Sequence, residues 1–131
     1  AIHAGWRGLV GRIVTKGIEM MKRDFGSIAS DLLCAVGPAI STEIYEVGDE
    51  LKPQFAEAGF PIKEIFIDRT DWTKWHLDLK AAVRFELLNN GIAEQNIEIS
   101  DICTYQHSSK YFSARKLNIN SGRIFSGIIL K

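Results

Sequence analysis

Apolar residues follow a helical period over the first part of the chain. Between Leu9 and Phe25 they recur every three or four positions, with charged residues between them. This spacing predicts one amphipathic helix over 9–25, ended by Gly26. We interpret Met20 and Met21 as packing residues, because methionine at helical spacing fills cores more often than it binds metal. The predicted stripe consists of Val10, Ile13, Val14, Gly17, Ile18, Met21 and Phe25.

Shorter patterns predict strands between further helices. A continuous apolar run over 32–36 predicts a buried strand, and alternating residues predict strands over 62–67, 97–102 and 123–130. Residues 41–48 form a predicted turn or short helix, and a weak helical stripe follows and ends near Gly59. Asp78 stands at an N-cap position before a predicted helix that Gly91 ends. Alternating strands and helices with a strand-rich end predict one α/β (α+β) domain, residues 1–131, with mixed sheets.

Composition is typical of a globular protein. The 131 residues include 16 basic and 16 acidic side chains, so charge gives no argument for binding nucleic acid or an anionic membrane surface. No apolar run approaches the length of a membrane span. Two cysteines do not indicate a disulfide scaffold, and we expect a reducing, cytoplasmic location.

The first residues combine a strand end, a glycine-rich turn and a helix start. Residues 1–4 read as the end of a buried strand, and Gly5 and Gly8 offer backbone angles that a side chain would forbid. Such a junction directs free N–H groups and a helix dipole at one point, which favours an anion. His3 is a potential metal ligand or general base there, and Arg7 is a permanent cation with a planar set of donors.

The run His-Ala-Gly-Trp-Arg-Gly at 3–8 resembles the signature of the laccase-domain, YfiH-like family. Proteins of this family were once described as polyphenol oxidases and are now understood as zinc-dependent purine nucleoside phosphorylases. Further matches follow in the family's order and extend nearly to the end of the chain. They are Gly37-Pro38-Ala39-Ile40, Tyr45-Glu46-Val47-Gly48, Asp78-Leu79, Asp101-Ile102-Cys103-Thr104, Phe112-Ser113-Ala114-Arg115 and Ser121-Gly122-Arg123.

The resemblance implies a four-layer α-β-β-α sandwich of which this chain is the C-terminal portion. The resemblance also implies a preceding N-terminal half, which in the family carries a further histidine and a cysteine for the zinc, together with an arginine-bearing loop. We therefore expect the partners to be a purine nucleoside, phosphate, and either the missing half or further copies of the chain.

The implied activity is phosphorolysis of adenosine, inosine or guanosine-type nucleosides, with adenosine deamination as a side activity. The resemblance places His3 on the zinc and gives Arg7 a catalytic role near substrate. It also implies a substrate- or phosphate-binding site, made up of Arg7, Gly8, Cys103, Ser113 and Arg115.

Several residues keep more than one interpretation. Cys103 either lines the pocket or packs beneath it, whereas Cys34 is a small buried apolar residue. His76 and His107 match no ligand position of the family, so we expect them at the surface or supporting the site. The remaining candidates are weaker: Arg123 for anion binding, and Tyr45 and Glu46 for the shape of the pocket.

Three other functions compete with the phosphorylase interpretation. A copper oxidase is poorly supported, since blue copper needs two histidines, a cysteine and usually a methionine that converge. A cysteine hydrolase would pair Cys103 with His3 and would be insensitive to chelators. The last alternative is an inactive fragment or a binding module that needs a partner.

Overall fold

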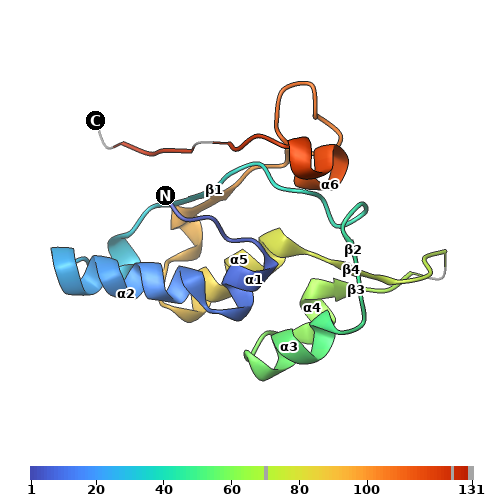
Figure 1. Cartoon of the computed structure of the whole chain (residues 1–131). Helices are drawn as coiled ribbons and strands as arrows, with labels where there is room; N and C mark the ends of the chain where they lie inside the picture. The colour runs from blue at the N-terminus through green and yellow to red at the C-terminus, as the bar shows by residue number, and fades with distance from the viewer. Residues whose placement is uncertain (70, 125, 130–131) are drawn as a thin grey trace.

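Three helices form the centre of the fold in the computed structural model, which describes residues 1–69, 71–124 and 126–129. They are α1 (Trp6–Val10), α2 (Ile13–Phe25) and α5 (Leu79–Asn89), and each contacts the other two (Figure 1). Their facing sides bury Leu9, Val14, Ile18, Ala82, Val83 and Leu87. Among the described residues, no helix is both long and apolar enough to cross a membrane.

The helix predicted over 9–25 is two helices. The first begins earlier than predicted, at Trp6, and the break falls at Arg12, which has a left-handed backbone (φ 57°, ψ 43°). The predicted end is confirmed: Gly26 has φ 64°, a conformation that glycine adopts without strain, and its N–H donates to Lys22 O (3.1 Å). The direction of the chain therefore changes shortly after the motif at 3–8.

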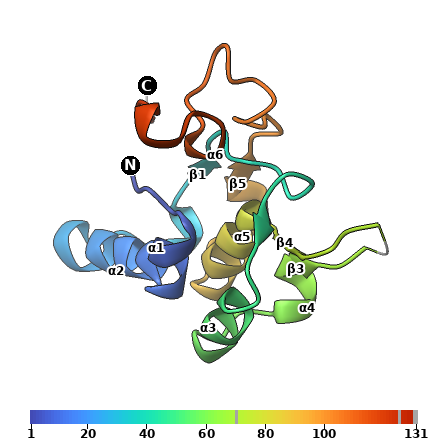
Figure 2. The same cartoon turned by 45° about the vertical axis from the view of Figure 1, so that its right-hand side comes forward.

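The strands form one parallel and one antiparallel sheet. Strand β1 (Cys34–Val36) pairs in parallel with β5 (Ile97–Ile99), and the second sheet has the order β2-β4-β3 with antiparallel neighbours. Its strands are β2 (Glu46–Val47), β4 (Trp75–Leu77) and β3 (Phe66–Ile67). Figure 2 shows α5 between the α1–α2 side of the molecule and this second sheet. The α/β class with mixed sheets is confirmed.

Short helices complete the fold around these sheets. The segment predicted as a strand over 62–67 is mostly helix. Helix α4 (Ile62–Ile65) starts after Pro61, whose carbonyl accepts a hydrogen bond from Glu64 N (2.9 Å). Only the last two residues of the predicted strand form β3. The predicted helical stripe before Gly59 is α3 (Leu51–Glu57), with Pro53 in its first turn, where proline is tolerated. The others are η1 (Ala29–Asp31), η2 (Glu94–Asn96), α6 (Ala114–Leu117) and η3 (Asn118–Asn120).

The predicted N-cap at Asp78 is confirmed, because its carboxylate accepts a hydrogen bond from Ala81 N (2.8 Å) at the start of α5.

The prediction for the end of the chain is wrong where the structure describes it, since residues 123, 124 and 126–129 form no strand. Residues 125 and 130 of that predicted strand lie outside the described residues.

One end of α2 is more exposed than its pattern predicts. Met20 is 52% exposed, Met21 39% and Phe25 73%, so our interpretation of the two methionines as packing residues is wrong here. The strand over 32–36 is also shorter and less buried than predicted, with Leu33 exposed and Cys34 partly buried. Apolar spacing predicted the helix correctly, but the described residues supply no covering layer for its far end.

Candidate functional site

The N-terminal motif is an extended segment followed by a short helix. Residues 1–5 make no strand, and Ala1, Ile2 and His3 are exposed, so the predicted buried strand end is wrong. The described part of the chain places no strand beside this segment with which it can pair. Helix α1 has only five residues, so its dipole is small and attraction of an anion depends on side-chain charge. His3 lies in the segment that leads into this helix.

Gly5 and Gly8 serve the motif through space rather than backbone angle. Gly5 has an extended backbone (φ −72°, ψ 171°), and a Cβ placed there would lie 3.0 Å from Nε2 of His3. A Cβ at Gly8 would lie 3.3 Å from the carbonyl oxygen of His3 and 3.1 Å from Cγ2 of Ile13. The imidazole therefore packs over a position that only glycine leaves open, and the predicted role of unusual angles is wrong.

Two predicted anion-binding residues act on Tyr45, Arg115 by contact and Arg7 by charge. Arg115 in α6 places its guanidinium 4.9 Å from the centre of the Tyr45 ring and donates a hydrogen bond to Glu46 O (2.9 Å). Arg7 is exposed in α1, lies 4.5 Å from the centre of its neighbour Trp6, and is close enough to act on the phenol by charge. Burial raises the pKa of Tyr45, and the charges of Arg115 and Arg7 oppose that rise. The structure thus gathers two cations and a phenol from distant parts of the sequence.

Cys103 lies in a nest of hydrogen-bond donors beneath the surface. Beyond the β1–β5 pairing and Gly37-Pro38, Ala39 and Cys103 form a further parallel bridge. Ser41 N donates a hydrogen bond to the Cys103 sulfur (3.3 Å). The residue is 2% exposed. Burial acts to raise the pKa of the Cys103 thiol, but the Ser41 side chain and the backbone N–H groups around the sulfur outweigh it, so this pKa is lowered. Among the described residues, the buried Ser41 hydroxyl has no hydrogen-bond partner of regular geometry.

The other predicted site residues have local partners. Ser113 is buried at the start of α6, and its carbonyl accepts from Lys116 N (3.1 Å) and Leu117 N (2.9 Å). Arg123 bonds only the neighbouring carbonyls of Ser121 and Gly122 among the described residues. These contacts give Ser113 and Arg123 structural partners and bring neither to His3.

The two remaining histidines differ in exposure. His76 is buried, stacks on Trp72 with ring centres 3.7 Å apart, and places Nδ1 2.7 Å from Thr42 O. The expectation of a surface position is therefore wrong for His76. His107 is exposed, as predicted, and its Nδ1 lies 3.1 Å from Cys103 O, its contact with the cysteine being to the backbone.

The described residues do not assemble a complete metal site. Within residues 1–69, 71–124 and 126–129, no three His, Cys, Asp or Glu side chains lie close enough together to hold a metal ion. His3 is one available imidazole ligand. A groove of about 460 Å³ between α4 and α5, lined by Glu64, Phe85, Leu88 and their neighbours, contains none of the predicted site residues.

Sequence reasoning did not identify Ser41 as a donor to Cys103, nor the pairing of Arg12 with Glu86 described below. Both connect residues far apart in the sequence, and neither lies in a spacing pattern that predicts contact. The pairing of Ala39 with Cys103 is what places Ser41 at the sulfur.

The comparisons with known proteins agree with the motif. The whole chain, residues 1–131, matches the model of a family described as multi-copper polyphenol oxidoreductase laccase, and the chain belongs to this family. It is 42% identical over 130 residues to a purine nucleoside phosphorylase of Bacteroides thetaiotaomicron, covering 99% of this chain and 48% of that protein. It is also 42% identical over 129 residues to adenosine deaminase RL5 of an unknown prokaryotic organism, covering 98% of this chain and 49% of the relative.

A solved structure supports the fold. The hypothetical protein YfiH of Bacillus licheniformis aligns with a TM-score of 0.75 at 30% identity, over 87% of this chain and 43% of that one. The predicted resemblance to the YfiH-like family is therefore confirmed. The chain spans about half the length of these relatives.

Proposed function

We propose that the protein is a purine nucleoside phosphorylase, a glycosyltransferase that acts on nucleosides. The observation that carries this proposal is the guanidinium of Arg115 over the Tyr45 ring, with the charge of Arg7 near enough to act on the same phenol. Inorganic phosphate is a multiply charged anion, and guanidinium groups recognise its oxygens with paired hydrogen bonds. The similarity to proteins named purine nucleoside phosphorylase supports the choice of reaction.

In the proposed reaction, the arginines hold phosphate against the anomeric carbon of the nucleoside. A phosphate oxygen forms a bond to this carbon as the bond from the carbon to the purine nitrogen breaks, and the purine leaves with the electron pair and takes up a proton. Holding the two reactants together removes much of the entropic cost of their meeting. The exposed guanidinium of Arg7 contacts the incoming phosphate, and Arg115 is fixed by its bond to Glu46 O (2.9 Å).

We propose zinc as the cofactor and His3 as one of its ligands. The described residues alone do not fit a complete zinc site, because they supply a single imidazole at this position. The other ligands in this proposal come from outside the described residues, and no step of the reaction above is derived from the metal. The packing of the His3 ring against Gly5 supports the choice of ligand, since it limits where the imidazole can lie.

Adenosine deamination is the second candidate activity. The similarity to adenosine deaminase RL5 favours it, at the same identity as the phosphorylase relative. In this hypothesis, water replaces the amino group of adenine and ammonia is released.

We further propose a cytoplasmic location, supported by two cysteines that are both free thiols.

The test compares inosine and adenosine turnover with and without phosphate, on the 131-residue chain and in parallel on a version extended upstream to the length of its relatives. We expect ribose 1-phosphate and free purine only when phosphate is present, inosine from adenosine as a minor product, and loss of zinc and activity in His3→Ala. Phosphate-independent loss of inosine, or full activity in His3→Ala, would contradict the proposal. Alkylation of Cys103 that inactivates a chelator-insensitive enzyme would favour the cysteine hydrolase.

A further inference from the structure

Arg12 occupies a backbone conformation that favours glycine. Its φ of 57° and ψ of 43° lie in the left-handed region, between α1 and α2. Backbone bonds fix the turn on both sides, from Arg12 N to Leu9 O (2.8 Å) and from Lys16 N to Arg12 O (3.0 Å). Since glycine would make the same turn with less strain, the contribution of this arginine lies in its side chain.

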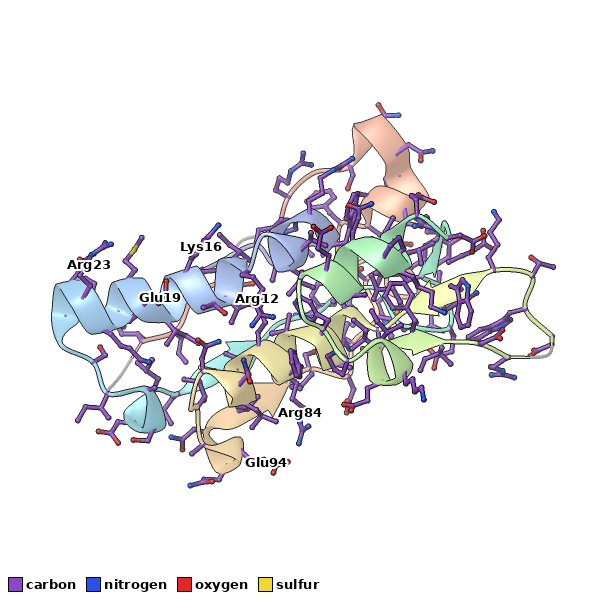
Figure 3. The ribbon with its side chains drawn as sticks, turned by 90° about the horizontal axis from the view of Figure 1, so that it is seen from below. Arg12, Lys16, Glu19, Arg23, Arg84 and Glu94 are labelled. Carbon is purple, nitrogen blue, oxygen red and sulfur yellow. The ribbon has the colours of Figure 1, made fainter. Side chains whose placement is uncertain are left out.

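That side chain connects the turn to α5. Nε of Arg12 lies 3.2 Å from Oε1 of Glu86, and the guanidinium lies 4.9 Å from the ring centre of Phe60 and 5.9 Å from that of Phe85. Figure 3 shows Arg12 extending from the start of α2 toward α5. The Arg12 side chain is 26% exposed and that of Glu86 is 0% exposed, so water screens this ion pair little.

A polar network extends the pair along α2. Thr15 Oγ1 donates to Oε1 of Glu86 (2.9 Å), and Asn90 Nδ2 donates to Thr15 Oγ1 (2.9 Å) and to Glu86 O (2.7 Å). In the described part of the chain, Oε2 of Glu86 and Nη1 of Arg12 are buried without a hydrogen-bond partner. A buried carboxylate with an unused oxygen is a poor source of stability. The pair is therefore better explained by the arrangement that it fixes.

The arrangement concerns the direction of α1. This helix is five residues long, packs into the core through the fully buried Leu9, and is followed by α2 after the turn at Arg12. The ion pair thus ties the turn at the end of α1 to α5, and Arg7 lies on α1. We propose that Arg12 and Glu86 are a positioning pair, which holds α1 so that Arg7 stays near Tyr45. The proposal rests on the proposed function for its kinetic consequence, and on geometry alone for its structural one.

The kinetic test uses the complete protein with inosine and phosphate. Arg12→Gly relieves the backbone strain but removes the tie, and Glu86→Gln keeps the shape of the side chain while it removes the charge. We expect both to raise the KM for phosphate about ten-fold, with kcat and the KM for inosine within about two-fold of the parent. Arg84→Ala is the matched control, because Arg84 pairs with exposed Glu94 on the other side of α5 (Figure 3) and should change no parameter.

If the pair is purely structural, both variants will have a lower free energy of unfolding and an unchanged KM for phosphate. That result would overturn the proposal. Should Arg12→Gly fail to fold, Glu86→Gln decides by the same criterion. These outcomes require a phosphorylase, so a second measurement is independent of activity.

That measurement is the ionisation of Tyr45, followed by ultraviolet absorbance, with Tyr45→Phe versions to assign the signal among the three tyrosines. Because the charge of Arg7 lowers the pKa of Tyr45, Arg7→Gln should raise it, and Arg12→Gly should raise it in the same direction. A parent-like pKa in Arg12→Gly, or no rise in Arg7→Gln, would overturn the positioning role. A protein without phosphorolysis but with both rises would refute the proposed function alone.

Discussion

The guanidinium of Arg115 lies 4.9 Å from the centre of the Tyr45 ring, and its Nη1 donates to the carbonyl of the next residue, Glu46 (2.9 Å). Two contacts on one short stretch leave the guanidinium little freedom to turn. An arginine held in this way has already lost much of the conformational entropy that binding an anion would cost.

Replacement of Arg115 by glutamine should weaken phosphate use. The expected loss is about 2 kcal/mol, or roughly 30-fold in kcat/KM for phosphate, which is typical of a hydrogen bond to a charged group. Arg123→Gln is the matched control, because its guanidinium bonds only the neighbouring carbonyls of Ser121 and Gly122 in the described structure. Steady-state kinetics at saturating nucleoside measures the effect. Equal losses in the two variants would show that Arg115 has no special role.

Replacement of Gly5 by alanine should disturb His3. The added Cβ would lie 3.0 Å from Nε2, tighter than side-chain contacts normally are, so the imidazole must move. If His3 binds zinc, we expect metal affinity to fall roughly ten-fold, as for other changes that reorient a ligand. Competition with a chelator gives the affinity. At Gly37 a new Cβ meets Ser126 Oγ at an ordinary 3.5 Å, so Gly37→Ala should bind zinc like the parent.

Replacement of Asp78 by alanine should destabilise the fold through α5. The carboxylate accepts the Ala81 N–H at 2.8 Å, and loss of such a cap costs about 1 kcal/mol. Asp78→Asn, which keeps an acceptor, should recover most of this loss. Asp71→Ala provides the comparison, because Asp71 and its partner Arg69 are both exposed and contribute little. Urea unfolding with an unchanged m-value checks the prediction, and equal effects at 71 and 78 would contradict it.

Periodicity predicted the helical segments well but missed the break between α1 and α2. The side chain at the left-handed turn pairs with Glu86, which lies far along the chain, and no local pattern contains that contact. The same limit explains α4, where Pro61 starts a helix in a stretch that alternates like a strand. Strand β4 was missed because its three residues are too few to show a period.

The site was predicted in part, and mainly through the motif. Residue types and the resemblance identified His3, Arg7 and Arg115 as candidates, and their site roles remain predictions. What the sequence could not show is that Arg115 lies beside Tyr45, because that contact depends on where α6 lies against β2. The environment of Cys103 was equally hidden, since the parallel pairing of Ala39 brings Ser41 to the sulfur.

The contributions of the two cysteines to the stability of the fold should change with pH in opposite directions. Partial burial raises the pKa of the Cys34 thiol, whereas burial at Cys103 is outweighed by donors to the sulfur and the pKa of that thiol is lowered. An acid with a lowered pKa in the folded protein stabilises it increasingly as pH rises from that folded value to the unfolded one. An acid with a raised pKa does the reverse, starting at the unfolded value.

Unfolding by urea between about pH 7 and about pH 10 tests this difference with Cys103→Ala and Cys34→Ala as a matched pair. The stability advantage of the parent over Cys103→Ala should grow with pH, because only the folded thiolate has the N–H groups of Ser41, Tyr105 and Gln106 around it. Its advantage over Cys34→Ala should shrink, because a thiolate at that half-buried position is poorly solvated. Since each substitution removes the same atoms at every pH, lost packing shifts each curve without changing its slope. Parallel curves for the two variants would show that the donors around Cys103 do not stabilise a thiolate.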